Sequence, residues 1–408
     1  MKYKILTVAL LSSLSIATTQ AQSLIWTQLA HPDSLQVNGI SFSFDGSQVL
    51  SGTNCHPAYI KLYNTMDGNV DWEYEAPMAL YCMMGVGFSA NGNYLASIEE
   101  MGNLLIFDYT QNPPDSIMGI DMGTTNAFAL AFAPNSNKIA VAGSNGKLQT
   151  YSLQTGLIDI DINAHPTWVT AVSYSPDNLK IATGGSDNKV NIWDTTGTLL
   201  YPLTGHTDDI TSVKFTPDNL KLISSAKDNT IKIWNANTGA LIQTIPVSTA
   251  NVNAIELSPD GSQIVSVSAD SYIRIYDVNT YSLESSFLQD HSVQPLCVAW
   301  SPDGNKIVTG TAKGLVTLYD ITTIGIADND HNLKISMYPN PSNKEMFIVL
   351  PVEEKSSKYF INNQLGQIVM EGYCIAGTNK INIENLNCGL YYINIEGHKK
   401  QVLKIVKE

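Results

Sequence analysis

A unit of 41 to 46 residues recurs seven times in this chain of 408 residues. In each copy a short apolar run leads into a polar turn, and a second run further along ends in an aromatic residue. The turn residues are Asp45, Asn91, Asn135, Asp177, Asp218, Asp260 and Asp303. The aromatic residues are Tyr63, Phe107, Tyr151, Trp193, Trp234, Tyr276 and Tyr319. A repeat of this length indicates a unit of about four strands that must stack on its neighbours to bury both faces.

Seven such units can close into a ring, which leaves only short, protected strand edges. We therefore expect an all-β chain with a seven-bladed β-propeller over residues 22–326, followed by a small C-terminal β-sandwich. Hydrophobic residues make up 44% of the chain and charged residues only 15%, which is enough apolar material for a large core. Runs rich in Val, Ile, Thr and Tyr, separated by Asn, Asp, Gly and Pro, fit the same architecture.

The first 21 residues have the pattern of a secretory signal peptide. Lys2 and Lys4 form a basic start, residues 5–17 are largely apolar, and residues 19–21 offer small side chains before a cleavage point. The apolar run is short for a bilayer, and no later run is apolar enough, so we expect no transmembrane segment. The sequence thus predicts export through the periplasm with removal of the signal peptide.

Charge and cysteine usage exclude some partners. The formal net charge of −14 repels phosphate backbones and argues against nucleic acid as a partner. No CxxC spacing occurs, so no metal site is expected. Cys297 lies in an apolar run and is expected to be a free core thiol. Cys55 and Cys82 can pair across neighbouring units, whereas the state of Cys374 and Cys388 stays open, because connectivity does not follow from sequence.

Two copies carry a His, a hydroxyl residue, an Asp and a Trp at matching positions. These are His165, Thr183, Asp187 and Trp193 in one copy, and His206, Ser224, Asp228 and Trp234 in the next. The pattern resembles the WD-repeat propeller family, in which these four side chains form a hydrogen-bonded tetrad within a blade. The chemistry is consistent, because a buried indole N–H and a buried imidazole need partners and the Asp supplies a charged acceptor.

A catalytic triad is the alternative interpretation of a His, a hydroxyl and an Asp. Recurrence in two copies, each completed by a Trp, favours a structural network, so we expect no catalytic residue and no cofactor. The tetrad decays in other copies. The sixth keeps Asp270 but lacks the His and the Trp, and the seventh has His291 and Thr309 with Lys313 at the Asp position.

Closure of the ring has to involve the N-terminus. The last copy has no good fourth strand after Tyr319-Asp320. The resemblance to the family implies that residues 23–29 supply the outer strand of the last blade. Closure by both ends of the chain removes an open sheet edge.

The C-terminal part forms a separate module. Residues 327–332 are polar without periodicity and are expected to be a linker, and short alternating strands over residues 333–408 predict the β-sandwich. The distinctive residues there are Tyr338, Pro339, Asn340, Pro341, Leu365, Gly366, Gly389, Leu390 and Tyr391. The module resembles the type A C-terminal sorting domain of the type IX secretion system of Bacteroidota. The resemblance implies recognition by that machinery, removal of the domain, and a passenger released or held at the cell surface. A ligand-binding sandwich is the alternative.

These observations predict a secreted or surface-exposed, non-enzymatic binding or scaffold protein. We expect the propeller rim opposite the Pro-Asp turns to recognise an extracellular protein, peptide or glycan. The candidate rim residues are Tyr81, Trp168, His56, Tyr59, Lys227 and Lys313. The alternative is a propeller hydrolase or lyase acting on extracellular polysaccharide or peptide, which would need paired carboxylates. The available acids are Glu99, Glu100, Asp121, Asp208 and Asp209.

Overall fold

The computed structural model describes residues 23–30, 36–54, 58–75, 82–123, 126–290, 293–322, 336–338, 344–350, 357–363, 367–375, 377–387, 389–395 and 402–407. The chain divides into two compact units, residues 1–327 and 328–408. Within the described residues, no helix is long and apolar enough to cross a membrane.

The first unit consists of seven four-stranded sheets, or blades. The inner strands are β2 (Val37–Phe42), β6 (Met83–Phe88), β10 (Ala127–Phe132), β14 (Val169–Tyr174), β18 (Ile210–Phe215), β22 (Val252–Leu257) and β26 (Pro295–Trp300). The second strands are β3 (Gln48–Thr53), β7 (Tyr94–Glu99), β11 (Lys138–Gly143), β15 (Lys180–Gly185), β19 (Lys221–Ala226), β23 (Gln263–Ser268) and β27 (Lys306–Thr311). The third strands are β4 (Tyr59–Asn64), β8 (Asn103–Asp108), β12 (Lys147–Ser152), β16 (Lys189–Asp194), β20 (Thr230–Asn235), β24 (Tyr272–Asp277) and β28 (Leu315–Asp320). The outer strands are β5 (Val70–Glu75), β9 (Asp115–Asp121), β13 (Ile158–Asn163), β17 (Leu199–Thr204), β21 (Leu241–Pro246), β25 (Leu283–Leu288) and β1 (Ser23–Leu29).

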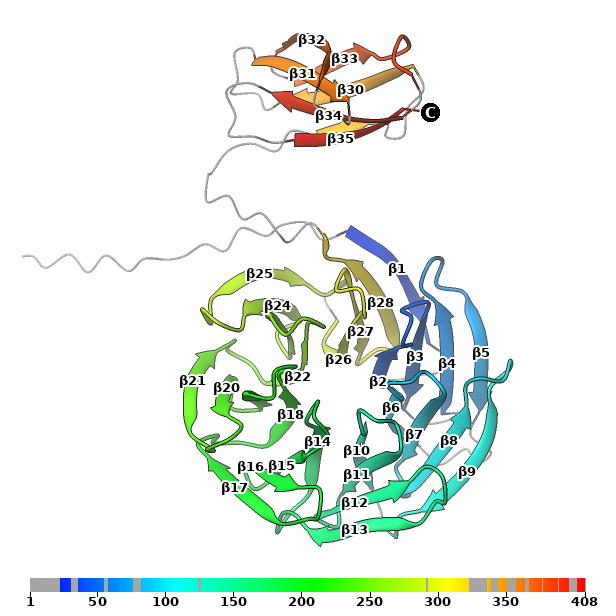
Figure 1. The fold of residues 1–408 in the computed structure, drawn as a ribbon, viewed down its shortest axis with the longest axis vertical. Coiled ribbons are helices and arrows are strands. Elements are labelled where there is room, and N and C mark those ends of the chain that lie inside the picture. The colour runs from blue at the N-terminus through cyan, green and yellow to red at the C-terminus, as the bar shows by residue number, and fades with distance from the viewer. Residues whose placement is uncertain are drawn as a thin grey trace, which may run out of the picture. The chain divides into compact units, whose positions relative to one another are not determined.

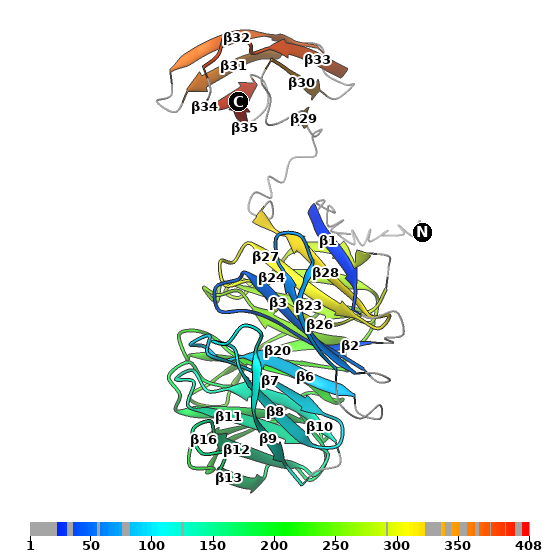
Figure 2. The ribbon, with the colours of Figure 1, turned by 90° about the vertical axis from the view of Figure 1, so that its right-hand side faces the viewer.

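The blades form a closed ring around a central channel, with the inner strands nearest its axis (Figure 1). Six blades are contiguous antiparallel meanders, whereas the seventh has the order β1-β28-β27-β26. Strand β1 pairs with β28 from Ser23 opposite Asp320 to Leu29 opposite Leu315. Figure 2 shows these two strands side by side at the edge of the ring. The predicted seven blades and their closure by the N-terminal strand are therefore confirmed.

In six of the seven blades the turn between the inner and second strands is held by the same local chemistry. In the first blade, Ser43 Oγ donates to Asp45 Oδ1 at 2.7 Å, and the same oxygen accepts the Ser47 N–H at 3.0 Å. In the fourth blade, Ser175 and Leu179 make the matching bonds to Asp177 at 2.6 and 3.0 Å. These turns are Asx turns, which explains why Asp or Asn recurs at this position.

A second local feature recurs at the outer edge of every blade. The outer strand carries one extra residue opposite the aromatic that ends the third strand, so the register shifts at this point in all seven blades. In the first blade Leu62 faces Trp72 and Tyr63 faces Val70, which leaves Asp71 as the extra residue. Such a β-bulge bends the strand and redirects its side chains.

The core of the first unit lies between neighbouring blades. One cluster joins Ala171 and Val190 of the fourth blade to Ile210, Leu222 and Trp234 of the fifth. Their exposed fractions are 5% or less. Because the apolar faces of each blade are covered only by the next blade, stability depends on a complete ring.

The second unit contains two sheets. The strands are β29 (Ser336–Tyr338), β30 (Glu345–Leu350), β31 (Ser357–Asn363), β32 (Ile368–Cys374), β33 (Gly377–Asn382), β34 (Gly389–Ile395) and β35 (Val402–Lys407). The sheet orders are β29-β30-β33 and β32-β31-β34-β35. Met346 and Ile381 of the first sheet share a buried cluster with Ile361 and Ile393 of the second. The all-β composition predicted for this part is thus present in its described residues.

Candidate functional site

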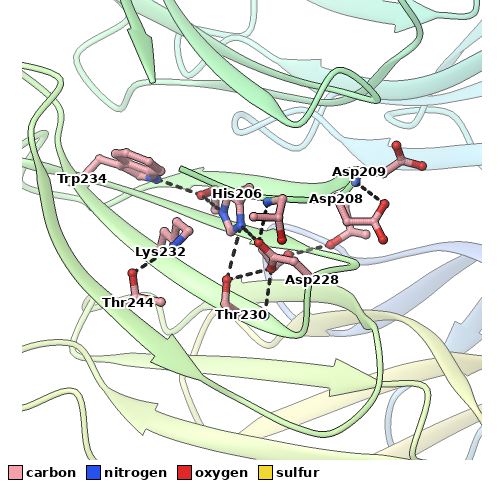
Figure 3. Close-up of polar contacts among 12 residues, drawn as sticks. His206, Asp208, Asp209, Asp228, Thr230, Lys232, Trp234 and Thr244 are labelled. Atoms are coloured by element: carbon pink, nitrogen blue, oxygen red, sulfur yellow. Dashed lines mark hydrogen bonds and ion pairs between the residues drawn. The ribbon is translucent and has the colours of Figure 1, made fainter. Parts of the chain in front are cut away.

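The two complete tetrads are closed hydrogen-bonded networks. In the fifth blade, His206 Nδ1 lies 2.8 Å from Asp228 Oδ2, and His206 Nε2 lies 2.8 Å from Ser224 Oγ (Figure 3). Trp234 Nε1 donates to the same Ser224 oxygen at 2.8 Å. The fourth blade repeats this arrangement, with distances of 2.8, 2.8 and 3.0 Å among His165, Asp187, Thr183 and Trp193. The predicted tetrads are therefore formed.

The chemistry of the network is that of a structural support. Burial lowers the pKa of His206, although the Asp228 carboxylate opposes this shift. Burial also disfavours the charged form of Asp228, but hydrogen bonds from Thr230, the Thr207 N–H and His206 outweigh it and lower the pKa of Asp228. A neutral imidazole thus lies beside an ionised carboxylate. The Ser224 hydroxyl, which would have to act as the nucleophile, is fully buried and already accepts a hydrogen bond from the Trp234 N–H.

We predict that Asp228→Ala lowers the free energy of unfolding by roughly 1–3 kcal/mol, because it removes the acceptor of a buried network. The carboxylate accepts from Thr207 N at 3.0 Å and from Thr230 Oγ1 at 2.7 Å besides contacting His206. The exposed Lys313 occupies the corresponding turn of the seventh blade, so Lys313→Ala is the control and is expected to change little. Urea denaturation measures both. Equal midpoints for the two variants would contradict a stabilising tetrad.

Other blades replace the tetrad with different polar groups. In the sixth blade, Arg274 Nη2 pairs with Asp270 Oδ2 at 2.7 Å and Arg274 Nη1 donates to Ser268 Oγ at 3.1 Å. In the seventh, Thr309 Oγ1 donates to Gln289 Oε1 at 2.8 Å. Arg274 and Gln289 were not predicted from the sequence, because neither residue type belongs to the family pattern. His291, which was expected to serve here, lies outside the described residues.

One of the predicted rim residues is an exposed aromatic beside the channel. Trp168 precedes β14 and is 53% exposed, and its ring lies 5.4 Å from that of Phe128 in β10. Phe128 in turn lines the channel on the side where the inner strands begin. Tyr59 is different and corrects our expectation of an exposed side chain. It is the first residue of β4, it is 9% exposed, and its N–H donates to Thr53 Oγ1 at 2.9 Å.

The remaining rim candidates do not form one cluster. Lys227 lies between β19 and β20 and pairs with Asp209 at 3.0 Å, whereas the exposed Lys313 lies two blades further on, between β27 and β28. Tyr81 and His56 lie outside the described residues. Trp168 and Lys227 come from adjacent blades, the fourth and the fifth, whereas Lys313 and the buried Tyr59 come from the seventh and the first, which meet where the ring closes.

The central channel contains two cavities. The larger, of about 520 Å³, opens at the Pro-Asp turns and is lined by Phe42, Phe88, Phe132 and Trp300 among others. The smaller, of about 200 Å³, lies toward the predicted rim. Between blades five and six an ion pair of Lys214 with Glu256, at 2.6 Å, lines both cavities. The larger cavity at the Pro-Asp end was not predicted.

The acids considered for catalysis belong to two separate blades. Glu99 and Asp121 end β7 and β9 of the second blade, whereas Asp208 and Asp209 precede β18 of the fifth. Burial raises the pKa of Glu99, although the Asn103 amide donates to it at 3.0 Å. No group of three or more His, Cys, Asp or Glu side chains in the described ranges is arranged to hold a metal ion.

The expectation that Cys297 is a free core thiol is confirmed. Cys297 is a free, buried thiol whose pKa burial raises to about 12. Cys82 is disulfide-bonded, and its expected partner, Cys55, lies outside the described residues. Cys374 is free and buried.

The residues of the expected sorting motif are only partly described. Tyr338 ends β29, and Gly389, Leu390 and Tyr391 begin β34. Tyr391 is buried, and its hydroxyl donates to the Asn387 carbonyl at 2.9 Å. Residues 339–341 and 365–366 lie outside the described residues.

Seven four-stranded blades, two of which contain a complete His-Ser/Thr-Asp-Trp network, define a WD-repeat β-propeller. Comparison with known families agrees with this class. A family model described as "IFT122 first beta-propeller" matches residues 168–402, more than half of the chain, and a model described as "WD domain, G-beta repeat" matches residues 22–64. The chain therefore belongs to the family of the IFT122 first beta-propeller.

Similarity to a curated protein is limited to a short segment. Beta-agarase A of Zobellia galactanivorans is 31% identical over 67 residues, which is 16% of this chain. The chain spans 12% of the length of that protein. A match of this extent assigns no activity to the propeller.

Proposed function

We propose that this chain is an exported, non-enzymatic binding or scaffold protein whose propeller rim recognises an extracellular protein, peptide or glycan. The observation that carries the proposal is the aromatic pair Trp168 and Phe128, which joins an exposed indole to the mouth of the channel. Rigid aromatic side chains at a concave, partly apolar surface are typical of binding sites. The His and Asp side chains that could suggest a hydrolase are hydrogen-bonded within buried networks.

The proposed route of export uses both ends of the chain. Residues 1–21 direct passage across the inner membrane, and residues 333–408 act as the type IX sorting domain, a small β-sandwich recognised by the secretion machinery. The two described sheets of the second unit share a buried core, which supports a sorting signal that is a folded domain and not a short linear motif. The mature passenger is then released or held at the outer cell surface, with the signal peptide and the sorting domain removed.

The rim is tested by binding to arrays of immobilised peptides and of glycans. We expect Trp168→Ala to weaken retained ligands by about tenfold or more, as loss of a central aromatic contact does. The matched control is Phe44→Ala, because Phe44 is also an exposed aromatic (65%) but lies at the Pro-Asp end of the channel. Binding that survives Trp168→Ala but is lost in Phe44→Ala would move the site to the opposite end of the propeller.

A further inference from the structure

The outer surface of the first two blades contains a concave pocket that is separate from the rim and the channel. It has a volume of about 450 Å³, within the range of small-molecule sites. Its walls come from the first blade and from the loop between β8 and β9 of the second. The lining residues are Gln48, Leu62, Asp71, Trp72, Tyr109, Gln111, Asn112 and Pro114.

The β-bulge of the first blade explains why a carboxylate and an indole meet in this pocket. Trp72 faces Leu62, and the extra residue Asp71 precedes it. Neighbouring residues in a regular strand point to opposite faces, but a bulge brings them to the same side. Asp71 and Trp72 both line the pocket for this reason.

In the first blade, the residue that follows the bulge is Trp72. In four other blades the residue at the same position is covered by the neighbouring blade. There the loop between the third and outer strands of the next blade places a glycine against the side chain. A Cβ added at Gly68 would lie 2.8 Å from Trp26, and one at Gly156 would lie 3.1 Å from Met118. The matching distances are 3.3 Å from Gly197 to Ile160 and 3.0 Å from Gly239 to Tyr201. These junctions leave no space above the covered side chain.

The junction between the first and second blades departs from this rule. Its loop, residues 109–114, contains no glycine, and it encloses the pocket instead of covering Trp72. Trp26 is the direct comparison, because it follows the bulge of the seventh blade. Trp26 is 8% exposed and donates its Nε1 proton to the Thr65 carbonyl at 3.1 Å. Trp72 is half-buried, and its indole N–H has no hydrogen-bond partner within the described part of the chain.

The pocket is held rigid by contacts across the two blades. Phe107 meets the Trp72 ring edge-on at 5.5 Å. Tyr109 donates its hydroxyl proton to Gln48 Oε1, and Gln48 Nε2 donates to Asp71 Oδ2 at 2.5 Å. The indole is therefore fixed in place before a ligand arrives, which lowers the entropic cost of binding.

We propose that this pocket binds a neutral saccharide. The indole offers an apolar platform for one face of a sugar ring, and the exposed amides of Gln111 and Asn112 offer both donors and acceptors to hydroxyl groups. No lining residue is cationic, and the Asp71 carboxylate disfavours an anionic sugar. A single carboxylate suits binding rather than glycoside hydrolysis, which uses two.

A saccharide fits these groups better than a cationic side chain does. A cation would be favoured by several aromatic faces or by an unpaired carboxylate. Here two aromatic residues line the pocket, but the Tyr109 hydroxyl is bonded to Gln48, and one oxygen of Asp71 already accepts from Gln48 as well. The remaining polar groups are mostly neutral amides, which match the alternating donors and acceptors of a polyol.

The test is titration calorimetry of the purified full chain with neutral gluco-, galacto-, manno- and xylo-oligosaccharides. Uronic-acid oligosaccharides and a trimethyllysine peptide are the comparison ligands. We expect at least one neutral sugar to bind, with a loss of about tenfold or more in Trp72→Ala and partial retention in Trp72→Phe. The double variant Gln111→Ala/Asn112→Ala changes only exposed side chains and is expected to weaken binding without affecting folding.

The outcome separates this pocket from the rim. Trp168→Ala should leave saccharide binding at the pocket unchanged, whatever it does to rim ligands. The proposal is overturned if no neutral sugar binds at millimolar concentration, or if binding is insensitive to both Trp72→Ala and the double variant. Binding of the trimethyllysine peptide that depends on Trp72, in preference to sugars, would overturn the ligand class.

Discussion

Trp26→Ala is expected to destabilise the propeller by about 3–5 kcal/mol, the usual cost of truncating a buried Trp. Trp26 belongs to the strand that closes the ring, and it is 8% exposed. Its indole packs on Tyr63 with the ring centres 6.0 Å apart and donates to the Thr65 carbonyl at 3.1 Å. The substitution would thus leave a cavity and an unpaired carbonyl at the junction of the seventh and first blades. Urea denaturation followed by far-UV circular dichroism measures the effect.

Leu24→Ala is the matched control on the same strand. Leu24 is 47% exposed, so its truncation should change the free energy of unfolding by no more than about 0.5 kcal/mol. A similar small change for Trp26→Ala would mean that β1 contributes little to closure. In that case the ring would be held by its other six junctions.

Deleting residues 333–408 is expected to leave a folded propeller in the periplasm, because the proposed sorting address is then missing. Every propeller sheet is built from strands within residues 23–320, so the truncation removes no blade strand. Fractionation of cells that express the truncated and full chains locates each protein. Near-complete retention of the truncated chain is the expected result.

The export experiment needs a control for folding. Resistance of the truncated chain to mild proteolysis reports an intact ring, so retention due to misfolding can be distinguished from loss of the address. A folded, truncated chain that still reaches the medium or the cell surface would contradict the sorting role. The ligand-binding sandwich would then become the better explanation of the second unit.

The architecture could be predicted because its determinants are local and repeated. In six of the seven blades the turn uses a bond from a hydroxyl to an Asp or Asn two residues later, as between Ser258 and Asp260 at 2.6 Å. The aromatic at the end of the third strand recurs in step with it. The last repeat has no fourth strand after Asp320, and the resemblance to the WD-repeat family implied that β1 supplies it; the pairing of Ser23 with Asp320 confirms this.

Polar contacts outside the family pattern could not be predicted. The imidazole of His206 and the hydroxyl of Ser224 are 18 positions apart, whereas Gln289 and Thr309, which bond in the seventh blade, are 20 apart. Because both the residue type and the spacing differ, the pair in the seventh blade cannot be recognised from the repeat pattern. Tyr59 was a candidate rim residue, but the strand β4 begins at this residue and buries it.

The pocket at Trp72 illustrates a different limit. In sequence, Trp26 and Trp72 occupy the same position of two successive outer strands, one repeat apart. What separates them is the facing loop, which contains Gly68 in one case and no glycine between residues 109 and 114 in the other. The absence of a glycine from that loop can be seen in the sequence. It indicates a pocket only once the structure shows that this loop faces Trp72 of the preceding blade.

The mixed origin of the seventh blade determines when folding can finish. Thr27 contacts Thr317 across 290 positions of sequence, whereas the strands of the other six blades are consecutive. Contacts over such separations form late, because the intervening chain must be ordered first. A chain delivered from its N-terminus onwards therefore stays an open row of blades, with exposed edges at both ends, until β28 has emerged. Assembly of the propeller is complete only when its first strand, β1, meets its last, β28.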